Sequence, residues 1–158
     1  MTASFTIPFA ALVVACSAPA TEVKVANSAA TAEPAPRPYE GDHRAPHTIG
    51  VVCDQGSGGG WCEEQVEDHI SIHGARDGAI AVAIRLVQTN AHSCTFDGEL
   101  VPAPAPQPDV RRWTFTHETD DGPCALQLDV TKHAIELSAN GCRYYCGMRA
   151  SLDAKFPL

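Results

Sequence analysis

Basic residues are scarce in this chain of 158 residues, which has 11 Lys and Arg against 19 Asp and Glu and a formal net charge of −8. A protein that binds nucleic acid needs clustered Lys and Arg to neutralise the phosphates. The shortage therefore argues against nucleic acid as a partner. The acidic balance suits a basic protein partner, and an ordinary soluble surface accounts for it equally well.

Long hydrophobic runs are also missing. The apolar run over residues 7–15 has nine residues, whereas a transmembrane helix needs about 20. No other segment is apolar enough to cross a membrane. The run at 7–15 instead has the length that is typical of the apolar core of a secretory signal.

Motifs of catalysis and of cofactor binding are missing as well. The chain has no His-Glu-x-x-His motif, no Gly-x-Ser-x-Gly elbow and no Gly-Lys-Ser/Thr phosphate loop. The acidic group at residues 63–68 and the histidines His69 and His73 are interpreted as a solvated face. We therefore predict that the protein is not an enzyme and that it has no catalytic residue and no cofactor.

The N-terminal segment resembles the signal peptide of bacterial lipoproteins. Residues 13–15 fit the positions before the cleavage site of the lipobox, and Cys16 fits the lipidated cysteine. Residues 1–15 carry no charge, so either the signal is atypical or the true start lies upstream. The resemblance implies a signal peptide over 1–15 and a lipid anchor at Cys16 that holds the chain at a membrane. Ser17 after the cysteine implies the outer membrane, with the protein facing the periplasm.

The residues after the cysteine have the composition of a linker. Residues 17–46 contain eight Ala and five Pro among thirty positions and show no hydrophobic period. Such a composition is typical of an extended or flexible spacer. We expect the lipidated cysteine and a disordered Ala/Pro-rich tether over residues 16–46, followed by one folded domain over residues 47–158.

Hydrophobic residues in this domain recur at every second position. The alternation runs through seven segments: residues 70–72, 80–86, 94–100, 113–117, 124–130, 135–137 and 148–152. A period of two predicts antiparallel strands with one buried face. The predicted fold is all-β, a small antiparallel meander of about seven strands curled into a barrel or sandwich.

The segments between the predicted strands contain residues that favour turns. The sequences Arg-Asp-Gly at 76–78, Asp-Asp-Gly at 120–122 and Asn-Gly at 140–141 are of this kind. The proline-rich segment 102–108 is predicted to be an exposed loop that does not pair in a sheet. A short helix is a weaker alternative near residues 63–68.

Six cysteines remain once Cys16 is assigned to lipid: Cys53, Cys62, Cys94, Cys124, Cys142 and Cys146. An even number in an exported chain predicts three disulfides. Cys94 and Cys124 both fall on inward faces of strands, so we predict that they pair. Cys53 and Cys62 flank a flexible glycine-rich loop and are predicted to close it. This leaves the Cys-x3-Cys segment at 142–146 to form the third disulfide.

Zinc is the competing interpretation of the Cys-x3-Cys segment. A tetrahedral site would need two further ligands, for which His117 or His133 is available, but nothing in the sequence brings either one close. Thiolates in an oxidising compartment pair with each other instead. We therefore expect no metal.

Three exposed aromatic side chains are the candidate contact residues. Trp61 lies beside the glycine run, where it either packs on the disulfide or contacts a partner, since interfaces favour Trp. Tyr144 and Tyr145 project from the loop between the last two cysteines, so at least one of them is expected to be accessible.

Four segments, at residues 67–72, 90–100, 124–130 and 142–153, resemble in this order a largely uncharacterised group of small exported proteobacterial proteins. The Asn-x-His-x-Cys segment at 90–94 and the Cys-x3-Cys-Gly segment at 142–147 match the cysteine-rich β domain of that group. Some comparable domains resemble those of envelope proteins linked to lysozyme inhibition. The usual closing Gly-x-Tyr is replaced here by Asp-Ala-Lys-Phe-Pro-Leu.

The expected function follows from the anchor, the linker and the cross-linked domain. We expect a non-enzymatic lipoprotein of the cell envelope whose tethered β domain binds or supports another envelope component. A periplasmic lysozyme inhibitor is the alternative, and a metal-binding envelope protein is a second alternative.

Overall fold

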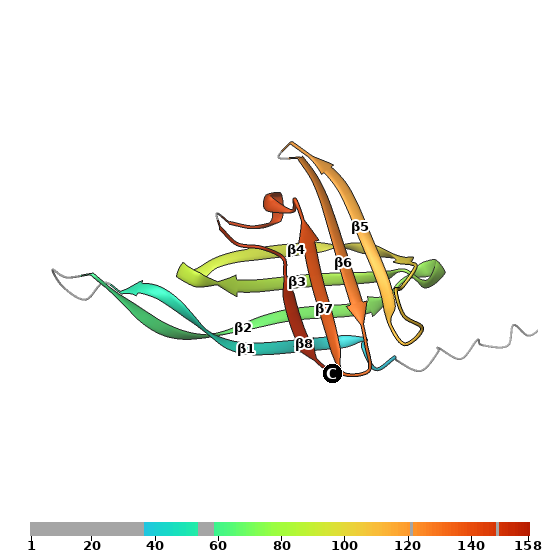
Figure 1. Ribbon diagram of the computed structural model, residues 1–158, viewed down its shortest axis with the longest axis horizontal. Coiled ribbons are helices and arrows are strands. Elements are labelled where there is room, and N and C mark those ends of the chain that lie inside the picture. Colours follow the sequence, from blue (N-terminus) through green and yellow to red (C-terminus); the bar gives the residue numbers. More distant parts are fainter. Residues whose placement is uncertain (1–36, 54–58, 121, 148) are drawn as a thin grey trace, which may run out of the picture. The chain divides into compact units, whose positions relative to one another are not determined.

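Eight antiparallel strands make up the described part of the chain, and each lies next to its neighbour in sequence (Figure 1). They are β1 (Gly41–Cys53), β2 (Gly60–Gly74), β3 (Ile80–Gln88), β4 (His92–Ala103), β5 (Arg111–Thr119), β6 (Gly122–Val130), β7 (Ala134–Asn140) and β8 (Ala154–Pro157). The all-β meander is confirmed, with eight strands instead of about seven.

The computed structural model describes residues 37–53, 59–120, 122–147 and 149–158. All of these belong to the unit Ala35–Leu158. The predicted signal peptide, the lipidation site at Cys16 and most of the predicted tether lie outside the described residues.

The sheet curls into a nearly closed barrel made of two halves. Strands β1–β4 run at a steep angle to β5–β8, and β8 lies beside β1 (Figure 1). The two halves join where Val101–Ala103 of β4 pairs with Arg112–Thr114 of β5, a ladder of only three residue pairs. The short junction lets the sheet turn so that its two inner faces pack against each other.

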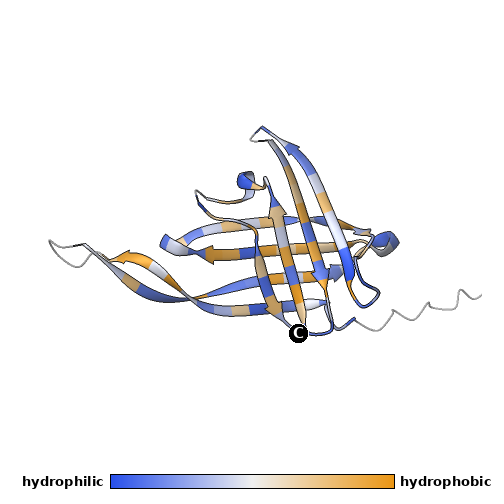
Figure 2. Ribbon diagram, in the orientation of Figure 1, coloured by the Kyte–Doolittle hydropathy of each residue, from blue (hydrophilic) through white to orange (hydrophobic). Residues whose placement is uncertain are grey.

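Alternating burial along the strands creates the core between the two halves. Every second residue of β3 from Ile80 to Leu86 is buried, and the residues between them are exposed. The pattern is visible as alternating colour along the strands (Figure 2). The fully buried side chains include Ile70, Ile72, Ile80, Leu86, Leu100, Leu126, Leu128, Ile135, Leu152 and Phe156. The period of two in the sequence thus corresponds to one buried face.

Tyr39 extends the folded domain beyond the predicted boundary. Its side chain is only 3% exposed, and its ring centroid lies 5.2 Å from that of Trp113. The predicted end of the tether at residue 46 falls inside β1. The linker composition was misleading here because the inward positions of β1 hold Ala45 and histidines, which give no hydrophobic alternation.

Three local predictions are wrong. The segment 63–68 is part of strand β2 and not a helix. Of the strand predicted over 148–152, residues 149–152 form no strand and residue 148 lies outside the described residues; the last strand is Ala154–Pro157. Arg149 has a φ of 67°, which breaks an extended chain. Pro102 and Ala103 pair with β5 at the end of β4, so the exposed loop starts after them.

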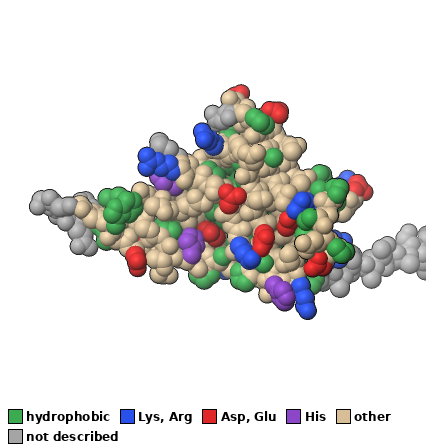
Figure 3. All heavy atoms as spheres, in the orientation of Figure 1, with side chains coloured by type: hydrophobic (Ala, Val, Ile, Leu, Met, Phe, Trp, Pro, Cys, Tyr) green, Lys and Arg blue, Asp and Glu red, His purple; other side chains and the backbone are tan. Residues whose placement is uncertain are grey.

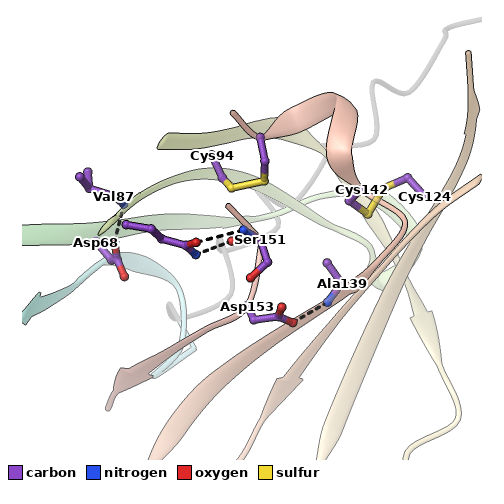
Figure 4. The surroundings of a disulfide bond; sticks show 10 residues. Asp68, Val87, Cys94, Cys124, Ala139, Cys142, Ser151 and Asp153 are labelled. Carbon is purple, nitrogen blue, oxygen red and sulfur yellow. Dashed lines mark hydrogen bonds between the residues drawn. A yellow bond between two sulfur atoms is a disulfide. The ribbon is translucent and has the colours of Figure 1, made fainter. Parts of the chain in front are cut away.

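Three disulfides are present among the described residues, but only one of the predicted pairs is confirmed. Cys53 is bonded to Cys62 as predicted. The other two bonds join Cys94 to Cys146 and Cys124 to Cys142, as Figure 4 shows for the second. The 3-10 turn η4 (Arg143–Tyr145) separates the last two cysteines, so each of them reaches a different strand.

Candidate functional site

The β1–β2 hairpin extends beyond the rest of the sheet (Figure 1, left). β1 pairs with β2 along the whole of Gly41–Cys53, whereas β2 pairs with β3 only over His69–Gly74. Residues 45–53 and 60–68 therefore form a two-stranded ribbon, which we call the arm.

The outer end of the arm carries two large exposed hydrophobic side chains. Val52 and Trp61 are direct cross-strand partners, so their side chains share one face. They are 66% and 68% exposed. The Trp61 ring lies over Gly50, where an added Cβ would be 3.4 Å from the ring. Figure 3 shows hydrophobic side chains gathered at this end of the domain.

The Cys53–Cys62 disulfide joins the two strands on the other face of the arm. Cys62 is paired with Val51 and Cys53 with Gly60, so the two cysteines are diagonal neighbours on the face opposite Trp61. A covalent bond at this position fixes the register of the two strands. The exposed side chains of Val52 and Trp61 are thereby held at one place relative to each other.

Hydrogen bonds attach the arm to the end of β3 and to the 3-10 turn η3 (Thr89–Ala91) that follows it. The Val52 N–H donates to Asn90 Oδ1 at 3.1 Å, and His47 Nε2 donates to the Val87 carbonyl oxygen at 3.0 Å. The Val87 N–H donates to Asp68 Oδ1 at 2.8 Å (Figure 4). The Asp68 carboxylate thus accepts a backbone N–H of β3 just beyond the point where the β2–β3 ladder ends. These contacts hold the inner part of the arm and the backbone of Val52, and they leave the side chains of Val52 and Trp61 exposed.

Acidic side chains lie beside the hydrophobic end of the arm. Glu63 and Glu64 are exposed, and neither forms an ion pair within the described part of the chain, whereas Glu67 pairs with Arg44. The interpretation of this group as a solvated face is confirmed for the three glutamates. Glu63 shares the face of Trp61, and Glu64 lies on the opposite face with Cys62. The two unpaired carboxylates give this end of the arm a negative charge on both faces.

Asp42 lies on β1 near the base of the arm, and its pKa is lowered from the usual value. The main cause is a side-chain hydrogen bond with Ser71; loss of hydration opposes it, and the charge of His69 adds to it. His69 Nε2 lies 3.3 Å from Asp42 Oδ1. Because the folded-state pKa is depressed, any stabilisation from this group is present at neutral pH and is lost as the pH falls through the lowered pKa.

The two tyrosines of η4 differ in their environment. Tyr144 is 65% exposed, whereas Tyr145 is half-buried and packs edge-on against Phe96 with ring centroids 5.1 Å apart. Tyr145 therefore belongs to the edge of the core. Tyr144 remains a candidate contact residue, on a different element from Trp61.

Sequence reasoning identified Trp61 and missed Val52. The only local signal for Val52 is the pair of β-branched residues before Cys53, and its exposure depends on the register with β2. All six cysteines of the domain are in disulfides, so Cys142 and Cys146 offer no thiolate for zinc. Among the residues described, no group of three or more His, Cys, Asp or Glu is placed to hold a metal ion.

The described residues include no helix of the length and hydrophobicity needed to span a membrane. Comparisons with protein-family models, with curated proteins and with solved structures find no significant match. The arm and the η4 turn are therefore interpreted from their own geometry.

Proposed function

We propose that this chain is a non-enzymatic binding protein of the bacterial cell envelope, whose β domain holds another envelope component through the arm. The observation that carries the proposal is the exposure of Val52 and Trp61, side by side on a disulfide-linked ribbon. Trp is among the residues that contribute most to binding free energy when an interface covers it.

The rigidity of the arm supports a role in binding. A flexible loop loses conformational entropy when it binds, whereas a ribbon held in register by a disulfide loses less. The contacts of Val52 with η3 and of His47 with the end of β3 restrict the arm further. The free energy gained by burying the Trp61 ring would therefore be little reduced by ordering of the arm.

Two features support a location in the cell envelope. The segment over residues 7–16 resembles a lipoprotein signal, with Cys16 as the lipidated residue. Three disulfides suit an oxidising compartment such as the periplasm. A lipid anchor at Cys16 would hold the domain at the membrane, and the arm would contact the partner.

Replacing Trp61 by Ala is expected to weaken partner binding by about 30-fold or more, the loss typical of a central interface residue. The partner would be captured from envelope extracts with the wild-type chain, identified by mass spectrometry and titrated against purified variants. The matched control is Val101→Ala, since Val101 is also exposed (54%) but lies on β4. Equal affinity of the Trp61→Ala variant, or detectable hydrolase turnover with no captured partner, would contradict the proposal.

The unpaired carboxylates of Glu63 and Glu64 favour a second candidate, inhibition of a lysozyme. Lysozymes of the common c-type are basic, and complementary charge accelerates association and sets its salt dependence. The purified domain is expected to inhibit c-type or g-type lysozyme, and Glu63→Gln with Glu64→Gln is expected to weaken that inhibition most at low salt. Absence of inhibition of either enzyme at micromolar excess would remove this candidate.

A further inference from the structure

A hollow of about 440 Å³ lies at the start of β1, at the opposite end of that strand from the outer end of the arm. It forms where the segment before β1, the start of β5 and the turn between β6 and β7 meet. Its polar lining comes from Arg37, Tyr39, Asp109, Arg111, Thr131 and Lys132.

Two arginines of this hollow converge on one oxygen atom. Arg37 Nη1 donates a hydrogen bond to Tyr39 Oη at 2.8 Å, and Arg111 Nη1 donates to the same oxygen at 3.4 Å. The Arg111 guanidinium also lies over the Tyr39 ring, 5.7 Å from its centroid. Because Tyr39 is buried against Trp113, it is a fixed support that holds both guanidinium groups at the hollow.

The positive charges of the hollow are poorly compensated. The nearest carboxylate contact of Arg37 is with Glu40, at 4.0 Å. Within the described ranges, Arg111 and Lys132 form no ion pair. The carboxylates of Asp109 and of the last residue, Leu158, also line the hollow, and neither is within ion-pair distance of these side chains. The Tyr39 hydroxyl oxygen accepts both hydrogen bonds and so orients the two arginines. Three cations thus face one hollow in a chain whose net charge is −8.

We propose that this hollow is a binding site for the phosphate group of a small molecule. Arginine guanidinium groups match the oxygens of phosphate with two parallel hydrogen bonds, and lysine adds a compact positive charge. Arg37, Arg111 and Lys132 supply two such groups and one ammonium, which is more positive charge than a single carboxylate requires. The hollow leaves room for the remainder of the ligand beside the phosphate.

Nuclear magnetic resonance of the ¹⁵N-labelled mature chain tests the site directly. Titrations with inorganic phosphate and with glycerol 3-phosphate, at an ionic strength held constant with NaCl, should shift the backbone and side-chain N–H signals of Arg37, Arg111 and Lys132 in a saturable way. Tighter binding of glycerol 3-phosphate identifies a phosphomonoester as the ligand class, and tighter binding of inorganic phosphate identifies the free ion. No saturable shift with either probe would overturn the proposal.

Charge-removing variants separate a built site from general electrostatic attraction. Arg111→Gln and Lys132→Gln are each expected to weaken phosphate binding by about tenfold or more, the effect of losing one charge-assisted hydrogen bond. Arg85→Gln is the control, because Arg85 is exposed on β3 and lies outside the lining; its affinity should stay within about twofold of wild type. Equal weakening by all three variants would overturn the proposal. Arg111→Lys keeps the positive charge and loses the two parallel donors of the guanidinium group. Its affinity for phosphate is therefore expected to lie between those of the wild type and of Arg111→Gln.

Discussion

Removing the Cys94–Cys146 disulfide is expected to lower the free energy of unfolding by about 4 kcal/mol, the largest loss among the three disulfides. This bond joins residues 52 apart in the sequence, whereas the Cys124–Cys142 and Cys53–Cys62 bonds join residues 18 and 9 apart. In the chain-entropy model, the corresponding losses for the two shorter loops are about 3 and about 2.6 kcal/mol. Each loss is a substantial part of the free energy of unfolding of a folded domain, which is typically about 5–15 kcal/mol.

Urea unfolding of three double variants measures this order. Each bonded pair is replaced by Ala, and the free energies of unfolding are compared with that of the wild-type chain. The variant that lacks Cys94 and Cys146 should be the least stable, because its bond closes the longest loop. The variant that lacks Cys53 and Cys62 should lose the least and should retain the barrel. A reversed order of the three losses would show that loop length does not determine the contribution of these bonds.

Gly141→Ala is expected to destabilise the domain by about 3 kcal/mol or more. Gly141 has a φ of 74°, in the left-handed region, and an added Cβ would lie 2.0 Å from the carbonyl oxygen of Pro123. That oxygen belongs to the backbone of β6, next to Cys124, whose disulfide to Cys142 holds the two segments together. Neither backbone can move away without disturbing this cross-link.

Gly122→Ala is the matched control for this substitution. Gly122 also has a positive φ, 104°, but nothing lies within 4 Å of its added Cβ. It therefore reports the conformational cost of the left-handed backbone without the clash. Thermal or urea unfolding should show the Gly141 variant to be clearly less stable than the Gly122 variant. Equal stability would mean that the contact with Pro123 is relieved by a small backbone shift.

The strands with one hydrophobic face were the ones best predicted from the sequence. β3 and β6 alternate strictly, because each packs one face on the core and exposes the other. The arm was not predicted, because its strands have no regular hydrophobic alternation. Its strands lie beyond the main sheet, and the acidic residues of β2 carry no core-facing period there. Local composition alone therefore gave a tether for part of β1 and a weak helix for part of β2.

Pairings between distant segments were the hardest to predict. The burial of Cys94 and Cys124 was correctly read from the strand pattern, but burial does not say which buried cysteines meet. The hollow shows the same limit, because Arg37, Arg111 and Lys132 are brought together only by the curl of the sheet. Trp61 was identified from its unusual residue type, whereas the exposure of Val52 follows from strand register.

The nesting of the disulfides has a consequence for biogenesis. The Cys124–Cys142 bond lies inside the sequence segment that the Cys94–Cys146 bond closes. If the chain is exported from its N-terminus, as its first residues suggest, cysteines oxidised in order of emergence would join Cys94 to Cys124 first. Reaching the native bonds then requires thiol–disulfide exchange through a mixed intermediate. For a chain exported in this way, the folded yield should therefore depend on a disulfide isomerase as well as an oxidase.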